Sequence, residues 1–427
     1  MTRILVLLAL VLAVLVAGLA RPQKRVAVPS KQPDFSLASG VSFTTQVLGK
    51  GKNDPRITNI QIIDFDRDGL KDVLVCDQSR NAVILYRQTP QHTFEEHVLA
   101  DGLNCPVHAT AVDLDGDGDL DVVVSILGDI LPSDELVGKV VVLENEGNWK
   151  FTRQIILDDV RRVADVQAGD FNGDGKMDLA VAVFGYARGE ILWLENRGKE
   201  NGKWRFRDHQ LLDRPGTIHV PVGDFNNDGK PDIAAVVSQD EEEVWVFENQ
   251  GGGSFVPHRI YYSDNFDIGS AGLVAVDLNQ DGKLDLLLPH GDNLEDRYSW
   301  PQPYHGCVWL ENRGDWNFVP KKIGSFGGTY AAAAGDFDGD GHLDVVLASY
   351  LSDKKHPSLV WLKNDGHENF TTFKIDSLPI GLVTVAAGDL NGDGKADVVA
   401  GGLHLPPFPI GGYQGATIWL SRGGGKK

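Results

Sequence analysis

One pattern of acidic residues recurs along the chain, namely Asp-x-Asp/Asn-x-Asp-Gly-x-x-Asp. Its seven copies begin at Asp64, Asp113, Asp170, Asp224, Asp277, Asp336 and Asp389. Carboxylate, amide and main-chain oxygens gathered in so short a segment are the hard donors that Ca²⁺ prefers. Closely spaced carboxylates also repel one another unless a cation lies among them. We therefore expect each copy to be a calcium-binding loop, with up to seven structural Ca²⁺ ions in all.

Each loop offers side-chain oxygens at positions one, three, five and nine, and the main-chain carbonyl of position seven. The order begins as in an EF-hand, although Asp stands at position nine and no Glu closes position twelve. The alternative is that these side chains only satisfy turn amides, which the regular recurrence disfavours. A saturated cage leaves no open coordination position, so we expect no catalysis by the metal. The predicted ligands are Asp64, Asp66, Asp68, Leu70 and Asp72; Asp113, Asp115, Asp117, Asp119 and Asp121; Asp170, Asn172, Asp174, Lys176 and Asp178; Asp224, Asn226, Asp228, Lys230 and Asp232; Asp277, Asn279, Asp281, Lys283 and Asp285; Asp336, Asp338, Asp340, His342 and Asp344; and Asp389, Asn391, Asp393, Lys395 and Asp397.

The elements around each loop also repeat, at spacings of 49 to 59 residues. A short apolar run precedes each loop, and a run typical of a β-strand follows it, such as residues 72–76 and 344–349. A third run ends in Trp-Leu-Glu-Asn or a relative, and a fourth opens with an aromatic residue. Four strands per repeat of about 50 residues are typical of β-propeller blades. The sequence thus predicts an all-β, seven-bladed propeller with four-stranded blades.

The two ends of the repeat array are complementary. Residues 43–48 have the pattern of a fourth strand, whereas the last repeat stops after its third strand, near Leu420. We expect the N-terminal strand to join the last blade and close the ring, which removes the open sheet edge of a linear array.

The loops 169–181 (GDFNGDGKMDLAV) and 334–348 (AGDFDGDGHLDVVLA) resemble the FG-GAP/VCBS-type repeat family. That family includes the propeller heads of integrin α-subunits and many exported bacterial proteins. The resemblance covers about residues 41–423, and it implies a calcium propeller that serves as a binding or adhesion module.

The N-terminal region differs in composition from the repeats. Residues 4–20 form an apolar run after Arg3, which predicts either a cleaved signal peptide or a single-span membrane anchor. Residues 21–40 contain prolines without periodicity, as in a linker, and residues 41–427 form the propeller. We expect an exported protein that is secreted, periplasmic or anchored at the cell surface.

Charge and cysteine usage narrow the function classes. The formal charge of −20 opposes binding to phosphate backbones, so we expect no nucleic-acid partner. Contact with a membrane is expected only through an N-terminal anchor.

The three cysteines, Cys76, Cys105 and Cys307, are too few for a disulfide framework. They are expected to be buried thiols, with a single Cys76–Cys105 bond as the alternative.

Loop insertions are concentrated on the face opposite the calcium loops, at residues 126–138, 289–306 and 402–415. Long loops on a rigid scaffold commonly carry recognition. Aromatic rings beside carboxylates and an arginine could stack on a sugar, although these rings could equally pack the loop down. The candidate ligand-binding residues are Asp292, Arg297, Tyr298, Trp300, Tyr304 and Tyr330.

Four histidines are placed at strand ends on the same face, namely His108, His219, His290 and His404. If they converge near the central channel they are candidate catalytic residues, and otherwise they are separate rim or core residues. Asp165, Tyr186 and Arg188 have a similar placement. No motif for a nucleophilic enzyme occurs in the sequence.

The sequence therefore favours an exported, calcium-stabilised binding or adhesion module for a glycan or an extracellular protein. The alternatives are a polysaccharide lyase or hydrolase with its active site in the central funnel, and a purely structural assembly component. Fold alone does not separate these functions.

Overall fold

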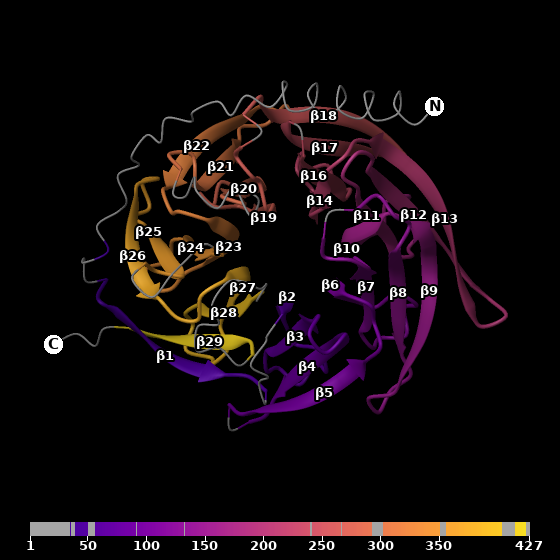
Figure 1. The fold of residues 1–427 in the computed structure, drawn as a ribbon, viewed down its shortest axis with the longest axis horizontal. Helices are drawn as coiled ribbons and strands as arrows, with labels where there is room; N and C mark the ends of the chain where they lie inside the picture. The colour runs from indigo at the N-terminus through magenta and orange to yellow at the C-terminus, as the bar shows by residue number, and fades with distance from the viewer. Residues whose placement is uncertain are drawn as a thin grey trace, which may run out of the picture.

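The computed structural model describes residues 35, 39–49, 56–90, 92–131, 133–239, 241–265, 267–292, 302–350, 356–403 and 415–423. These residues form seven antiparallel sheets arranged as a ring, so the prediction of an all-β, seven-bladed propeller is confirmed (Figure 1). Within the described part of the chain there is no helix long and apolar enough to cross a membrane.

The strands of each blade lie side by side, with the first strand nearest the centre of the ring and the fourth at its rim (Figure 1). Blades one to three consist of β2 (Ile57–Ile63), β3 (Asp72–Asp77), β4 (Ala82–Gln88) and β5 (Phe94–Ala100); β6 (Pro106–Val112), β7 (Asp121–Ile126), β8 (Gly138–Asn145) and β9 (Phe151–Val160); and β10 (Arg162–Gly169), β11 (Asp178–Phe184), β12 (Glu190–Glu200) and β13 (Lys203–Asp213). In blade four the inner strand is divided, giving β14 (Thr217–His219), β15 (Val222–Gly223), β16 (Asp232–Ser238), β17 (Glu242–Gly251) and β18 (Ser254–Ser263).

The remaining blades repeat the plan. Blades five and six consist of β19 (Val274–Val276), β20 (Asp285–His290), β21 (Gly306–Asn312) and β22 (Phe318–Gly324), and of β23 (Thr329–Gly335), β24 (Asp344–Ser349), β25 (Leu359–Asn364) and β26 (Phe370–Asp376). Blade seven contains β27 (Leu382–Gly388), β28 (Asp397–Gly402), β29 (Thr417–Gly423) and β1 (Val41–Val47). β1 pairs antiparallel with β29, from Val41 opposite Gly423 to Val47 opposite Thr417. Figure 1 shows this indigo strand beside the yellow one.

The core lies between the blades rather than within them. In β3, Val73 and Val75 pack toward blade seven, whereas Leu74 and Cys76 pack toward blade two. Because side chains alternate along a strand, the second and third strands of a blade must be apolar on both faces, and β3 is buried throughout. Each of the seven hydrophobic clusters joins two neighbouring blades. Burial of one such Val or Leu side chain contributes about 1.5–3 kcal/mol.

The cysteines belong to this apolar packing. All three are free and buried, which confirms the prediction of thiols that act as small apolar side chains. Burial raises the pKa of the Cys307 thiol to about 12, so this group stays protonated and unreactive near neutral pH.

The connections set the two faces of the ring. Every acidic loop joins the first and second strands of its blade, so all seven acidic loops lie on one face. The connections from the second to the third strand, and from one blade to the next, lie on the opposite face. The insertion at 127–137 joins β7 to β8 and therefore belongs to that opposite face, which we call the insertion face.

Acidic loops and the insertion face

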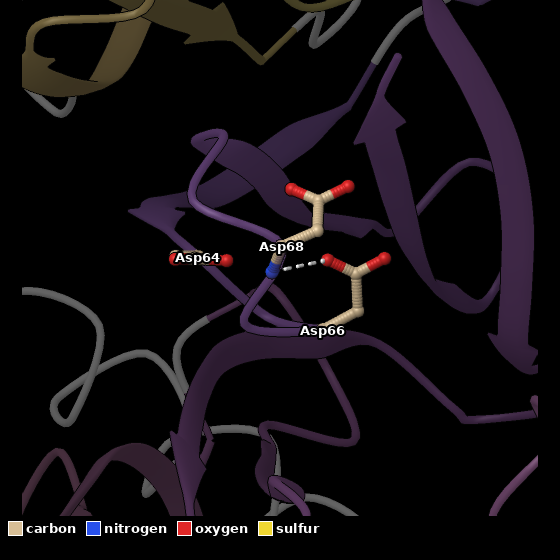
Figure 2. Close-up of side chains that lie close together, drawn as sticks. All are labelled: Asp64, Asp66 and Asp68. Carbon is tan, nitrogen blue, oxygen red and sulfur yellow. Dashed lines mark hydrogen bonds between the residues drawn. The ribbon is translucent and has the colours of Figure 1, made fainter. Parts of the chain in front are cut away.

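In all seven acidic loops the same side chains bind the loop backbone. The position-one carboxylate accepts the amide of the position-six glycine, for example from Gly229 to Asp224 at 2.7 Å. The position-three oxygen accepts the amide of position five, and the position-five carboxylate accepts the amide of position seven. Figure 2 shows the first loop, where the amide of Asp68 donates to Asp66 Oδ1 at 3.3 Å. These bonds turn the acidic side chains toward one another.

Three loops bring three carboxylates close together. One oxygen from each of Asp64, Asp66 and Asp68 lies within 4.8 Å of the other two (Figure 2), and the same holds for the groups at 113, 115, 117 and at 336, 338, 340. In the other four loops the position-three residue is Asn, which also offers an oxygen. Asp64 Oδ1 is buried without a hydrogen-bond partner among the described residues. Because a buried carboxylate oxygen without a partner is costly, the donor set fits a divalent cation with a preference for oxygen.

The position-nine aspartates differ from the other acidic side chains because they are buried. Asp232 accepts the amide of Phe225 at 3.0 Å and the amide of Asn249 at 2.7 Å, and the equivalent pair of bonds occurs in every loop. Burial raises the pKa of Asp232 to about 6, against the opposing effect of these two bonds. This carboxylate therefore ties the start of the loop to the end of the third strand, whether or not it also faces a metal ion.

The insertion at 127–137 is attached to the neighbouring blade. Both oxygens of Asp134 accept the amide of Ala187, at 3.0 and 3.1 Å. Arg162, which is 2% exposed, donates from Nη1 to the carbonyl of Leu131 at 3.0 Å, and its guanidinium lies 4.3 Å from the ring centroid of Phe184. The backbone amides of residues 186–188 hold the pKa of Asp134 below its ordinary value. Sequence reasoning missed Asp134 and Arg162, since nothing in an isolated loop indicates which backbone groups it will meet.

This attachment leaves three large apolar side chains exposed to solvent. Leu131, Leu136 and Tyr186 are 63%, 55% and 52% exposed, respectively, and they belong to the two attached loops. The loops that carry them are attached to each other, and loops held in place on a rigid scaffold commonly carry recognition. We call Leu131, Leu136 and Tyr186 the apolar group of the insertion face.

Two of the four candidate histidines meet at one carboxylate. His108 Nδ1 in β6 lies 3.0 Å from Asp165 Oδ1, and His219 Nδ1 in β14 lies 3.4 Å from Asp165 Oδ2. Gln167 and the amide of Val220 also donate to Asp165, at 3.1 and 2.9 Å. Burial opposes ionisation, but the two histidines and the amide outweigh it and lower the pKa of Asp165 to about 2.

The ion pairs and hydrogen bonds of Asp165 and its two histidines connect residues of blades two, three, four and five. His219 Nε2 lies 3.1 Å from the carbonyl of Ala271, which precedes β19 of blade five. Both ring nitrogens of His219 therefore face acceptor oxygens. Burial lowers the pKa of His108 despite the attraction of Asp165, so this second imidazole is suited to the neutral form. The donors around Asp165 fill both of its oxygens, as expected for a structural tie between inner strands.

His290 belongs to a different group. It is 2% exposed, and burial lowers its pKa to about 3, with a further contribution from Lys322 and His305. His305 Nδ1 accepts the amide of Gly328 at 3.0 Å, and burial lowers its pKa to about 4. His290 lies beside Tyr261 of blade four, with ring centroids 6.3 Å apart, whereas His305 contacts the backbone that leads into blade six, so neither imidazole belongs to the His108–Asp165 group.

The candidate ligand-binding residues are only partly described. Asp292 accepts a hydrogen bond from Tyr330 and raises the pKa of that phenol. Tyr330 lies beside Tyr350, with ring centroids 6.2 Å apart, and the Tyr304 ring is 5.2 Å from that of His305. Arg297, Tyr298, Trp300 and His404 lie outside the described residues, as do the N-terminal apolar run and almost all of the linker.

Comparison with known proteins gives a consistent result. A family model for the FG-GAP-like repeat matches residues 64–124, 129–181, 176–235, 224–288, 290–347 and 336–400. The T-cell immunomodulatory protein of Rattus norvegicus is 23% identical over 269 residues, which is 56% of this chain and 41% of the rat protein. The T-cell immunomodulatory protein homolog of Plasmodium falciparum is 27% identical over 272 residues, or 54% of this chain and 36% of that protein. The chain thus covers less than half the length of these curated relatives.

Among solved structures, the crystal structure of BBS1N in complex with ARL6DN is similar in fold. The TM-score is 0.53, and the match covers 90% of this chain and 98% of that one at 10% sequence identity. At this identity the similarity concerns the propeller fold alone.

Proposed function

Because the chain belongs to the FG-GAP-like repeat family, we propose that this propeller is a calcium-stabilised module that binds a protein partner outside the cell through its insertion face. The family and the curated relatives support a binding module in general terms. The choice of a protein partner and of this face rests on one observation, the apolar group that two attached loops hold in solvent.

The attachment supports recognition because it fixes the loops before binding. Leu131 and Leu136 lie on the insertion that Arg162 and Asp134 anchor, and Tyr186 lies on the loop that anchors Asp134. Pre-formed loops lose less conformational entropy when a partner binds. Tyr and Leu side chains on such loops contribute buried apolar area, with Tyr common among the residues that dominate binding energy.

A photocrosslinking experiment tests this proposal. A benzophenone amino acid is placed at Leu136 or, as the control, at Val256, which is 41% exposed on the outer strand of blade four. The full-length chain is then presented to the surface proteins of the cells that produce it. We expect a defined protein adduct at position 136 that disappears in the Leu131→Asp variant, and no such adduct at position 256. Equal crosslinking at both positions, or persistence in Leu131→Asp, would contradict the proposal.

Glycan binding remains the second candidate ligand class for the same face. Its predicted residues include Asp292 and Tyr330, which bond to each other at the edge of blade six. Retention of the full-length chain on immobilised polysaccharides, compared between wild type and Tyr304→Ala, distinguishes this candidate. Retention that depends on Tyr304 would favour a glycan over a protein.

The acidic loops would hold the calcium ions. The side-chain oxygens of positions one, three and five and the carbonyl of position seven are the proposed donors, as at Asp224, Asn226, Asp228 and Lys230 in blade four. A bound ion would neutralise the repulsion between these side chains and stabilise the loop. It would serve the fold, because it would join the side chains of positions one, three and five to the carbonyl of position seven.

We also propose that the apolar run at residues 4–20 directs the chain out of the cell. Millimolar calcium in extracellular fluids would suit exposed sites of moderate affinity. N-terminal sequencing of the mature protein separates a cleaved signal from an anchor: a start near residue 21 indicates cleavage, and retention of residues 4–20 in a membrane fraction indicates an anchor. Recovery of the whole protein in the cytoplasm would contradict export.

A further inference from the structure

Two basic side chains occupy equivalent positions beside the acidic loops. Arg87 in β4 and Lys363 in β25 each precede the last residue of the third strand of their blade. Arg87 pairs with Asp66 and with Asp68, the latter through Nη2 to Oδ2 at 2.9 Å. Lys363 likewise pairs with Asp338 and with Asp340, the latter at 3.0 Å. Each basic group thus bridges positions three and five of its loop.

Arg87 and Lys363 contact the carboxylate oxygens that do not accept hydrogen bonds from the loop amides. Oδ1 of Asp338 accepts the amide of Asp340, and Oδ1 of Asp340 accepts the amide of His342. Lys363 contacts the Oδ2 atoms of both aspartates. In blade one, Arg87 likewise contacts the Oδ2 atoms of Asp66 and Asp68, and the Oδ1 atoms accept hydrogen bonds from loop amides. A divalent ion that bound through positions three and five would need the oxygens that the basic group already contacts.

The occurrence of a basic residue at this strand position correlates with the residue at position three of the acidic loop. Blades two to five carry Glu144, Glu195, Glu248 and Glu311 at this place, and blade seven carries Leu420. Loops one and six have Asp at position three, whereas loops three, four, five and seven have Asn. Blade two is intermediate: its Asp115 pairs with Lys199 from the next blade at 2.7 Å. Throughout the described residues, an extra carboxylate at position three is therefore accompanied by a basic side chain from a strand.

The lysines at position seven form a different kind of contact. Lys176, Lys230 and Lys283 each approach a single carboxylate, at position five of their own loop, at 2.7, 2.6 and 2.9 Å. They do not bridge two positions, and their side chains extend from the exposed loop rather than from a strand. A metal ion can displace such a contact with a small rotation of one exposed side chain.

We propose that Arg87 and Lys363 are built-in counter-ions that hold the loops of blades one and six in shape without calcium and weaken calcium binding there. This inference rests on the proposed calcium binding of the acidic loops. Its consequence is that the seven loops are not equivalent: the four loops with Asn bind the ion first, and the loops of blades one and six bind it last. The basic side chain is a determinant of metal affinity that the loop motif does not contain.

The test compares calcium binding and melting of the full-length chain with Lys363→Gln and with the double variant Arg87→Gln/Lys363→Gln. Lys139→Gln is the matched control, because it removes the same charge from a side chain that is 41% exposed and lies at 4.0 Å from Asp158, away from the loops. Isothermal titration gives the number and affinity of sites. From the repulsion between a unit charge and a divalent ion about 4 Å apart in a high dielectric, we expect one site to tighten about 10- to 30-fold in Lys363→Gln.

Melting supplies a readout that an ordinary ion pair would not produce. In chelator, the double variant should melt below wild type, because its aspartates lose their counter-ions. In saturating calcium it should melt at or above wild type, because the ion takes their place. Equal destabilisation in both buffers would reduce Arg87 and Lys363 to structural ion pairs and overturn the inference.

The outcomes also separate the inference from the proposed function. If wild type binds calcium but the variants bind it with unchanged number and affinity, the counter-ion role is wrong and the calcium sites stand. If neither wild type nor variants bind calcium, both proposals are wrong. A site that is absent in wild type and present in Lys363→Gln would support both.

Discussion

Replacement of Asp165 by Asn tests whether the His108–Asp165–His219 group is a structural tie or a catalytic centre. Asp165 is 1% exposed, and its pKa of about 2 lies below the value of about 3.9 for an unfolded chain. At about 1.4 kcal/mol for each pKa unit, the ionised carboxylate contributes about 2–3 kcal/mol to folding at neutral pH. The amide of Asn would also face one of the present donors, which adds about 1–3 kcal/mol. We therefore expect Asp165→Asn to lower the free energy of unfolding by about 4 kcal/mol.

The assay is urea unfolding of the full-length chain, followed by tryptophan fluorescence in calcium buffer. The control is Glu95→Gln, which breaks an exposed pair: the Glu95 side chain is 63% exposed and lies 4.0 Å from His97. Exposed pairs of this kind contribute at most about 1 kcal/mol. The contribution of Asp165 is present at every pH above about 3.9 and is lost as the pH falls through about 2, because its folded pKa is the lower one.

The result that refutes this reasoning is equally definite. An Asp165→Asn midpoint that coincides with those of wild type and Glu95→Gln would show that the carboxylate does not tie the inner strands. If that variant had also lost a polysaccharide-cleaving activity present in wild type, the enzyme alternative would replace the binding module.

Three further predictions concern the packing between blades and the insertion face. Asn312→Ala should cost about 1 kcal/mol more than Asn364→Ala in urea unfolding, because Asn312 also donates to Phe225 of the preceding blade at 2.8 Å; equal costs would contradict this. Wild type should lose up to about 3 kcal/mol of stability through His305 as the pH falls from about 6.5 to 4, since the unfolded chain binds the proton first. His305→Asn, which keeps an acceptor for the amide of Gly328, should remove this part of the pH dependence, so the difference in stability between wild type and variant should change by up to about 3 kcal/mol across that range, and a constant difference would exclude His305 as a contributor. Asp134→Ala should speed proteolytic cleavage within residues 127–137 with little change in melting temperature, and equal cleavage rates would show that Asp134 does not anchor the insertion.

The blade architecture was predictable because each repeat contains the strand patterns and the loop motif of a complete blade. Segments such as Val73 to Cys76 are apolar at every position, as a strand buried on both faces requires. The loop motif marks the turn between the first two strands, so its seven copies number the blades. The complementary ends indicated the place of β1, which lies beside β29.

The side-chain contacts between blades were less predictable from the sequence. Asp165 meets His108 and His219, which lie 57 and 54 residues away along the chain, only because the ring places three inner strands side by side. The role of Asp134 depends on the amides of a loop in another blade. Arg87 and Lys363 did leave a signal, since they are basic at a position of the repeat where four other blades have Glu and blade seven has Leu420. The pattern of the repeat predicts the scaffold, and its departures indicate where individual blades differ.

The melting temperature of the full-length chain in calcium and in chelator tests the central claim most directly. At a calcium concentration of about ten times the dissociation constant, each occupied loop contributes about 1.4 kcal/mol, so several loops together should raise the melting temperature by about 10 °C or more. We expect that rise with calcium and its full reversal by chelator. Identical melting in both buffers would contradict the account of the acidic loops as calcium sites that stabilise this propeller.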